Sequence, residues 1–414
     1  MNKLFNLLKD NQIYLNYNQR RYDYILKSLK VKNKISVIFL VNHISQWKYQ
    51  SLFEIFNNKD KYDVSVIFIP DENYSEDYHN EYLINKKEFK KKNINLISSF
   101  DDLTKSWKNL NYLFNPDIVF YSRTLLKSNY KYSIYDFKNS LNCYAPYSLF
   151  IDKNDKLQCG TLFHKVLWKQ FLPFNENLKI AKNIYDAKNV LITDYIGCDF
   201  FKTKSRSNTI WKNKSHKKII IAPHHTIELN NKKNYFSTFL KLSEDFIHLS
   251  IKYKNMIDFC FKPHPALKKK LYSHKEWGIN KTNDYYNFWN NESNTILSEA
   301  HYHDLFVQSD ALILDSISFT AEYLYLNKPY CFLTKDNFDY NSSLNKIGEK
   351  IFKIINKSNN IYSIEKFIND NVIRTNENQL SLQRKTLNEL NIFNKNNKLA
   401  SENIFDFIDS SIFN

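Results

Sequence analysis

The sequence predicts an α/β protein of two domains, each with a parallel sheet, and three observations support this class. Short apolar runs of strand length alternate with segments of helical spacing, the pattern of a parallel sheet covered by helices. The 414 residues, 43% of them hydrophobic, exceed what a single core usually accommodates. Residues 202–218 carry Lys, Ser and Asn with almost no apolar content, so we place the domain boundary there.

The amino-terminal half contains six runs that we expect to be strands. The run at 35–41 is unbroken, as expected for a strand buried on both faces of a parallel sheet. A helix should follow it through residue 56, and residues 72–92 have helical propensity. The other expected strands are 64–70, 94–97, 117–121, 141–145 and 190–194.

The carboxyl-terminal half repeats this alternation. Helices are expected at 236–252 and 319–326, and the chain after residue 335 is mostly polar and helical. The expected strands are 218–222, 259–265, 311–315 and 328–333. The resulting division is a basic helical segment 1–32, an amino-terminal domain 33–205, a carboxyl-terminal domain 216–390 and a helical tail 391–414.

The charge balance points to a polyanionic partner. The formal net charge is +16, and lysine is scattered along the chain. We find neither zinc-finger spacing nor an arginine-rich arm, so we expect no nucleic-acid partner. Four glycines leave no room for a GxGxxG or Walker phosphate loop. Nucleotide phosphates, polyol phosphates and an anionic membrane face fit the charge.

The chain shows neither a signal peptide nor an apolar run long enough to cross a bilayer. The five cysteines have no metal-ligand spacing and resemble buried thiols of a reducing compartment. We therefore expect a cytoplasmic protein. The basic amphipathic spacing of residues 1–32 suits peripheral attachment to the inner face of the membrane, and equally a helix packed on the protein body.

Two stretches of the carboxyl-terminal half carry the strongest chemical signal. His264 lies between Pro263 and Pro265 where a strand must end, since proline cannot donate to a sheet ladder. Ser316 and its neighbours follow another strand and open a helix, where unpaired N–H groups favour a phosphate. Ligands of open α/β sheets bind at the carboxyl ends of strands, so a diphosphate could lie between the two stretches. An ordinary Pro-bounded loop and helix cap is the alternative.

These motifs, in this order, resemble those of the CDP-glycerol:poly(glycerophosphate) glycerophosphotransferases, and their capsule-type branch in particular. The resemblance covers about residues 35–335. Where the teichoic acid polymerases carry Trp-His-Gly-Thr-Pro, this chain has Gln-Cys-Gly-Thr at 158–161, and Lys262 replaces an arginine before the His-Pro pair. The matching stretches are Ser45-x-Trp47-Lys48-Tyr49, 143–147, 163–169, 222–227, 261–265 and 315–329.

The resemblance implies a GT-B fold, in which two Rossmann-like domains face each other across a cleft. The nucleotide donor would sit on the carboxyl-terminal domain and the acceptor largely on the amino-terminal one. The implied reaction transfers glycerol phosphate or ribitol phosphate from CDP-glycerol or CDP-ribitol to a hydroxyl of a cell-surface glycan, which could be lipid-linked, and releases CMP. Enzymes of this fold generally need no bound metal or cofactor, and we expect none.

The resemblance also assigns roles to individual residues. His164 is the expected base of the acceptor side, with a helix histidine bonded to a carbonyl as the alternative. His264 would donate to the diphosphate and steady the leaving CMP. Glu322 resembles the acid that holds a nucleotide ribose, although a solvent-facing helix glutamate is as plausible.

The remaining expected residues contact the donor or the acceptor. Lys262 would add positive charge, with a solvated lysine as the alternative. The donor side further includes His224, His225, Asp315, Ser316, Ser318 and Thr320, and the acceptor side His43, Trp47 and Tyr147. A His224–His225 metal site is disfavoured, because no carboxylate or thiol lies at useful local spacing.

Two other functions fit the same sequence. A glycosyltransferase of the GT-B fold would use a nucleotide sugar in capsule or lipo-oligosaccharide synthesis and attack carbon rather than phosphorus. A non-catalytic scaffold would bind polyanions or membranes and would need no histidine chemistry.

Overall fold

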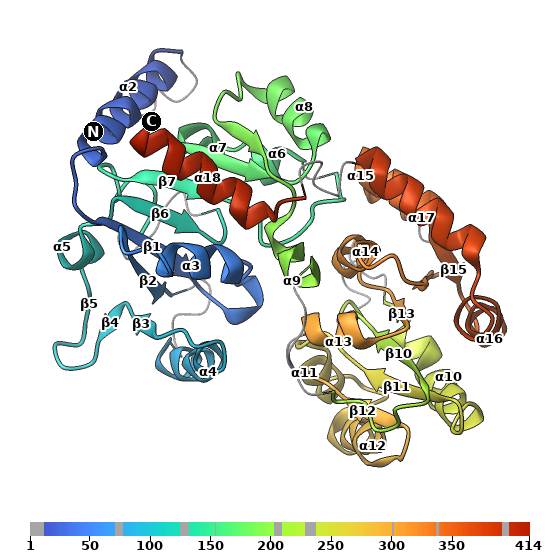
Figure 1. The fold of residues 1–414 in the computed structure, drawn as a ribbon. Coiled ribbons are helices and arrows are strands. Elements are labelled where there is room, and N and C mark those ends of the chain that lie inside the picture. The colour runs from blue at the N-terminus through green and yellow to red at the C-terminus, as the bar shows by residue number, and fades with distance from the viewer. Residues whose placement is uncertain are drawn as a thin grey trace. The chain divides into compact units, whose positions relative to one another are not determined.

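A computed structural model of the 414-residue chain describes residues 12–70, 78–124, 132–153, 155–202, 209–227, 237–299, 302–336, 339–390 and 397–414. The chain forms two compact units (Figure 1). Unit 1 comprises Met1–Phe150, Asn154–Asp199 and Asn391–Asn414, and unit 2 comprises Ile151–Lys153 and Phe200–Leu390. Among the described residues, none of the helices combines the length and the apolar character that crossing a bilayer requires.

Unit 1 is built on a seven-stranded sheet within the described chain, in the order β3-β2-β1-β6-β7-β8-β9. Every neighbouring pair is parallel. The strands are β1 (Ile35–Val41), β2 (Tyr62–Phe68), β3 (Leu96–Ser98), β6 (Ile118–Tyr121), β7 (Leu141–Tyr144), β8 (Lys169–Leu172) and β9 (Val190–Ile192). The helices are α2 (Gln12–Leu29), α3 (Gln50–Asn57), α4 (Tyr78–Lys90), α5 (Leu110–Phe114), α6 (Asp155–Cys159), α7 (Leu162–Val166), α8 (Asn175–Ile184), α9 (Asp199–Lys202), which leads into unit 2, and α18 (Ala400–Phe413).

The described residues of unit 2 form a six-stranded parallel sheet in the order β12-β11-β10-β13-β14-β15. Its strands are β10 (Lys217–Ala222), β11 (Ile257–Phe261), β12 (Thr295–Leu297), β13 (Ala311–Leu314), β14 (Tyr330–Leu333) and β15 (Asn356–Ser358). Its helices are α10 (Phe239–Lys252), α11 (Leu267–Tyr272), α12 (Gly278–Asn291), α13 (His303–Gln308), α14 (Ile317–Leu324), α15 (Lys346–Ile354), α16 (Ile361–Phe367) and α17 (Glu377–Leu390).

The predicted α/β class with parallel sheets is confirmed, and all ten expected strands are present. The expected strand at 259–265 ends earlier, at Phe261, because the prolines that follow cannot join the ladder. Within the described residues, three strands of the two parallel sheets were missed, β8, β12 and β15, as was the separate pair β4 (Phe100–Asp101) and β5 (Ser106–Trp107). All of them are only two to four residues long and carry polar side chains, so they lack the apolar run on which the prediction depended. The five cysteines are buried free thiols, as predicted.

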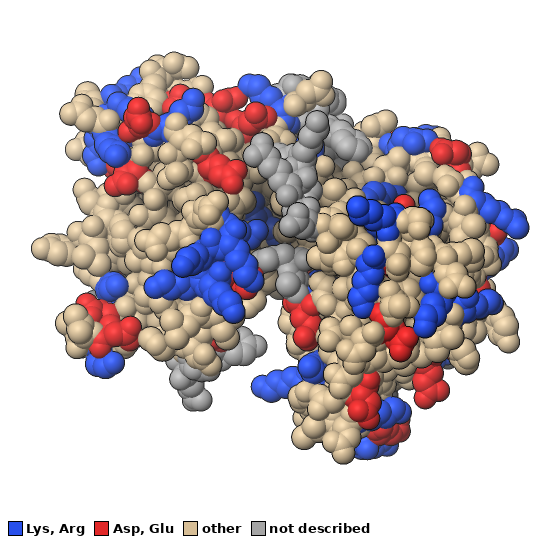
Figure 2. Space-filling model, turned by 60° about the horizontal axis from the view of Figure 1, so that its bottom comes forward, with Lys and Arg blue, Asp and Glu red and all other residues tan. Residues whose placement is uncertain are grey.

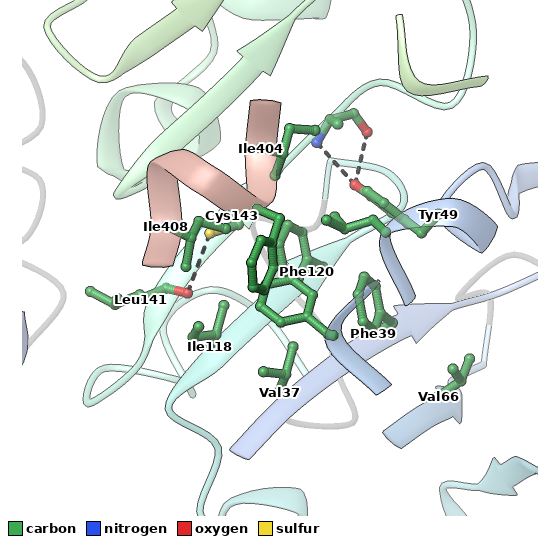
Figure 3. Packing of buried hydrophobic residues seen from close by; sticks show 14 of the residues in the cluster. Val37, Phe39, Tyr49, Val66, Ile118, Phe120, Leu141, Cys143, Ile404 and Ile408 are labelled. Carbon is green, nitrogen blue, oxygen red and sulfur yellow. Dashed lines mark hydrogen bonds between the residues drawn. The ribbon is translucent and has the colours of Figure 1, made fainter. Parts of the chain in front are cut away.

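The core of unit 1 is formed by the inner strands and by two helices from opposite ends of the chain. Phe39 of β1 stacks on Phe120 of β6, with ring centroids 4.7 Å apart. Ile404 and Ile408 of α18 pack into the same cluster (Figure 3). Buried side chains of α2 join it as well, so for the described part of segment 1–32 the packed-helix alternative holds.

Tyr49 ties two strand ends together inside this core. Its hydroxyl donates to the carbonyls of Tyr121 and Ala145 at 2.8 and 3.0 Å and accepts from the Ala145 N–H at 2.9 Å. Figure 3 shows the ring beside Phe39. Tyr49 ends the Ser-x-Trp-Lys-Tyr stretch, so this part of the motif fixes the carboxyl ends of β6 and β7.

We predict that Tyr49→Phe destabilises unit 1 by about 2 kcal/mol, since buried backbone groups lose their partner while the ring still packs. The urea midpoint followed by tryptophan fluorescence measures this loss. Tyr24→Phe is the matched control because Tyr24 is 75% exposed. A midpoint shift no larger for Tyr49→Phe than for Tyr24→Phe would contradict the prediction.

Candidate functional site

Three adjacent strands of unit 2 end at the same edge of the sheet. Strand β10 lies between β11 and β13, and all three run parallel. Pro223 follows β10, Lys262 follows β11 and Asp315 follows β13. The His264 N–H donates to the Pro223 carbonyl at 3.0 Å, which holds the β11 loop against the β10 loop. The expected convergence of polar groups at strand ends is therefore present, with β10 between the two stretches that the sequence singled out.

Three histidines form a cluster at this edge. The ring centroids of His225 and His264 are 4.1 Å apart, those of His224 and His225 4.3 Å, and those of His224 and His264 4.9 Å. Ring nitrogens from all three lie within 4.8 Å of one another. The structure thus joins the Pro-His-His and Pro-His-Pro stretches into one site, which we call the histidine cluster.

A buried carboxylate holds the cluster in place. Asp315 is fully buried, and its Oδ1 accepts from the His224 N–H at 2.5 Å. Its Oδ2 accepts from the Ser237 hydroxyl at 3.0 Å and from the N–H and hydroxyl of Thr238 at 2.7 and 3.1 Å. Asp315 therefore connects β13 to the loop after β10 and to the start of α10. Desolvation raises the pKa of this carboxyl to about 6.

Two of the three imidazoles, those of His224 and His264, are neutral at physiological pH. Burial, and after it the neighbouring His225 and His264, lower the pKa of His224 to about 2. Burial, followed by the nearby His225 and the lysines Lys262 and Lys270, lowers the pKa of His264 to about 4. An arriving anion would therefore meet, at His224 and His264, imidazoles that bring no fixed charge.

The tautomer of His264 follows from its backbone contact. The Ala266 N–H donates to Nδ1 of His264 at 3.1 Å, so the proton of the neutral ring sits on Nε2. Nε2–H is then a donor pointing away from that loop. A metal ligand would need the Nε2 lone pair, so this geometry fits donation to an oxyanion better than metal ligation. Lys262 is 5% exposed and supplies the nearby cationic group, whose own pKa burial lowers.

The serine-bearing turn lies between β13 and α14. Ser316 precedes α14 in extended conformation and is nearly buried. Thr320 is fully buried, and its hydroxyl donates to the Ser316 carbonyl at 3.1 Å, a contact internal to the helix. The side chain of Ser318 lies outside the described residues. Glu322 is buried, and its Oε2 accepts a hydrogen bond from the Tyr302 hydroxyl.

Tyr302 and the start of α10 were not predicted as part of the site. The Tyr302 hydroxyl donates a hydrogen bond to Glu322, the expected ribose-binding acid. The ring centroids of Tyr302 and Phe319 are 4.7 Å apart. The hydroxyls of Ser237 and Thr238 donate hydrogen bonds to Asp315. No local pattern indicates these roles, because each depends on a partner about 20 to 80 residues away in the chain.

The expected acceptor-side residues lie in unit 1. His43 is exposed after β1, where its Nδ1 accepts from the Ser45 N–H at 3.1 Å, and Tyr147 is 37% exposed. Trp47 is 4% exposed and packs edge-on against Phe39 and Phe89, so most of its surface belongs to the core.

His164, the expected base, is enclosed in α7. It has no exposed surface, and burial lowers its pKa to about 3. The Thr161 N–H donates to its Nδ1 at 3.2 Å, and its Nε2 meets no hydrogen-bond partner among the described atoms. Because Nδ1 accepts, the proton of the neutral ring sits on Nε2, which is a buried donor. The role of His164 as the base therefore stays a prediction, and it requires that the surroundings of the ring change when the acceptor binds.

Comparison with known structures defines the class of fold. The wall teichoic acid polymerase TagF, in a variant structure, matches with a TM-score of 0.59 and 14% identity over 95% of this chain and 93% of that one. UDP-GlcNAc 2-epimerase from Neisseria meningitidis matches at 0.58 and 13% identity over 91% and 100%. A putative UDP-N-acetylglucosamine 2-epimerase from Listeria monocytogenes matches at 0.58 and 12% identity over 91% and 96%. The protein is of the GT-B class, as predicted.

The family follows from the sequence itself. The model of the CDP-Glycerol:Poly(glycerophosphate) glycerophosphotransferase family matches residues 202–409, half of the chain. The chain belongs to this family and is a transferase of the glycerophosphotransferase type. A search of curated proteins found no match. The matched segment contains the histidine cluster, Asp315 and Glu322.

Acidification should lower the stability of unit 2 through His264. The folded pKa of about 4 lies below the ordinary 6.5, so between these values the unfolded chain binds a proton that the folded chain does not. The contribution of His264 is therefore zero above pH 6.5 and becomes destabilising as pH falls toward 4, by at most about 3 kcal/mol. We predict that His264→Gln removes this part of the pH dependence, measured as urea midpoints across the window.

Asp315 has a raised pKa and acts in the opposite direction, but it is present in wild type and variant alike. The difference between the two proteins thus isolates His264. His248→Gln, on the exposed side of α10, is the control and should keep the wild-type slope. Parallel curves for wild type and His264→Gln would show that the imidazole is not held neutral in the folded state.

Proposed function

We propose that this protein transfers a polyol phosphate from a CDP-activated donor to a hydroxyl of a cell-surface glycan and releases CMP. The observation that carries the proposal is the histidine cluster at three strand ends, in which Nε2 of His264 carries the ring proton. This edge is where open α/β sheets bind ligands, and it lies within the segment that matches the family.

The donor class rests on the family and on a structural neighbour. The family description contains CDP-glycerol, and another TagF structure of the same fold, at TM-score 0.53 and 13% identity, was soaked with CDPG. CDP-glycerol and CDP-ribitol share the cytidine diphosphate that unit 2 would hold. His264 and Lys262 would contact the diphosphate, assisted by His224, His225 and the turn at 316–320. Glu322 would hold the ribose.

The proposed step is an in-line displacement at phosphorus. The acceptor oxygen bonds to the β-phosphorus, the bond from that phosphorus to the bridging oxygen breaks, and CMP leaves with the electron pair. Charge grows on the bridging oxygen, where the Nε2–H donor of His264 stabilises it. The hydroxyl proton passes to a base, a role we assign to His164, and the acceptor rests against His43, Trp47 and Tyr147.

The acceptor and the cellular setting complete the proposal. A glycan under assembly, free or linked to a lipid, offers hydroxyls, and its phosphates suit a chain of net charge +16. The buried free thiols fit a reducing compartment, so we place the protein in the cytoplasm, with peripheral attachment to the inner membrane face.

A donor panel tests the proposal against its alternatives. With a mixture of capsular oligosaccharides as acceptor, we expect CDP-glycerol or CDP-ribitol to give CMP and a phosphodiester product, detected by 31P NMR. The panel includes UDP-, GDP- and CMP-sugars. Nucleoside diphosphate released from a sugar donor, with a glycosidic product, would instead favour a glycosyltransferase. Thermal stability unaffected by every nucleotide would favour the scaffold.

We predict that His264→Gln lowers kcat about 1000-fold, because a donor aimed at developing charge contributes roughly 100- to 1000-fold or more. Initial rates of CMP release measure the effect. His248→Gln should retain full activity. Unchanged kcat in His264→Gln, with normal circular dichroism, would refute the assignment.

His164→Gln separates a base from a packing residue. Loss of a base lowers kcat and removes the acidic limb of the pH–rate profile, while donor affinity stays near wild type. A variant that loses stability but keeps the profile would give His164 a structural role only.

A further inference from the structure

The outer face of α4 combines exposed apolar side chains with a run of lysines. Leu83 and Ile84 are adjacent on the outer side of the helix and are 48% and 56% exposed, and neighbouring exposed apolar side chains are more informative than single ones. The next turns carry four exposed lysines: Lys86, Lys87, Lys90 and Lys91. Together with Leu103, introduced below, these seven residues are named the basic–apolar face.

The inner side of α4 fixes which residues point outward. Phe89 is fully buried, with its ring 5.2 Å from that of Trp47. Asn85 is also buried, and its Oδ1 accepts from the Ile44 N–H at 2.7 Å. The helix therefore cannot rotate to hide Leu83 and Ile84 without breaking these contacts, and the aliphatic side chains stay exposed in unit 1.

A neighbouring hairpin extends the apolar part of this face. Strands β4 (Phe100–Asp101) and β5 (Ser106–Trp107) pair antiparallel. Asp102 at the turn lies 3.5 Å from Nδ1 of His79 at the start of α4. The adjacent Leu103 is 95% exposed. Figure 1 shows the hairpin and α4 on the same side of unit 1.

The charge of the face is strongly one-sided. Residues 86–92 contain five lysines and one acid, Glu88, which pairs with Lys91 at 2.6 Å. Figure 2, which brings forward the lower side of Figure 1, shows a dense group of Lys and Arg side chains on unit 1. Within a Debye length of an anionic surface, each such lysine adds favourable energy.

We infer that the basic–apolar face docks on an anionic lipid bilayer, with the lysines at the headgroup phosphates and Leu83, Ile84 and Leu103 in the acyl boundary. Aliphatic tips beside lysines are what separate this occupant from a soluble polyanion, which would use the charges alone. The inference rests on the proposed function in one respect: transfer to a lipid-linked glycan would explain why the protein attaches to a membrane.

Segment 1–32 competes poorly for this role in its described part. Tyr22, Ile25 and Leu29 of α2 are buried in the core of unit 1, and the Tyr22 hydroxyl donates to the Val166 carbonyl at 2.7 Å. These three side chains of α2 are covered by the core, whereas Leu83 and Ile84 of α4 are exposed.

The test is co-sedimentation of the full chain with vesicles of phosphatidylcholine alone or with one third phosphatidylglycerol, without donor or acceptor. We expect binding to the anionic vesicles only, weakened by salt. The triple variant Lys87→Gln/Lys90→Gln/Lys91→Gln should lower the partition coefficient about 100-fold, at about fivefold per lysine. Leu83→Ser/Ile84→Ser should lower it about tenfold at unchanged net charge.

The matched control is Lys346→Gln/Lys350→Gln/Lys353→Gln, which removes the same charge from the exposed side of α15 and should change binding less than about twofold. Equal losses of vesicle binding in both triple variants would overturn the inference. Binding to duplex DNA is measured alongside, and an α4 triple variant that loses affinity for DNA but not for vesicles would overturn it too. CMP release on a water-soluble acceptor is measured in parallel. Vesicle binding lost with release intact, or the reverse, tells which of the two proposals fails.

Discussion

The buried carboxylate of Asp315 is the interaction on which the candidate site depends. It accepts hydrogen bonds from His224, Ser237 and Thr238, which belong to two segments of unit 2 that precede it by 77 to 91 residues. A buried charge without such donors would be costly, so the loop after β10 and the start of α10 are held to the end of β13. This constraint places His224, and through ring contacts His264, beside the turn at Ser316.

That arrangement has an electrostatic consequence. Imidazoles packed together in a buried site cannot easily all carry charge, so burial and proximity keep His224 and His264 neutral. A diphosphate would change the balance, because its negative charge favours protonated rings and pairs with Lys262. The site is thus suited to an oxyanion, with little fixed charge to neutralise when the ligand is absent.

The sequence predicted most of the fold because its central strands are continuous apolar runs buried on both faces. It missed β8, β12 and β15, whose short polar stretches gain strand structure only from their neighbours in the sheet. The convergence of His264 with the Asp315 turn was predictable from the strand-end rule. Contacts such as that of Tyr302 with Glu322 were not, because they depend on packing between distant helices. Burial of Trp47 likewise reflects tertiary context.

Nitrogen-15 NMR of the histidine rings, with cluster resonances assigned by single His→Gln variants, tests the account most directly. Titration with CDP-glycerol or CDP-ribitol should shift the Nε2 resonance of His264 and those of its two ring neighbours, while His248 stays unchanged. Donor binding detected by calorimetry without any shift of the cluster resonances would contradict a diphosphate site at these strand ends.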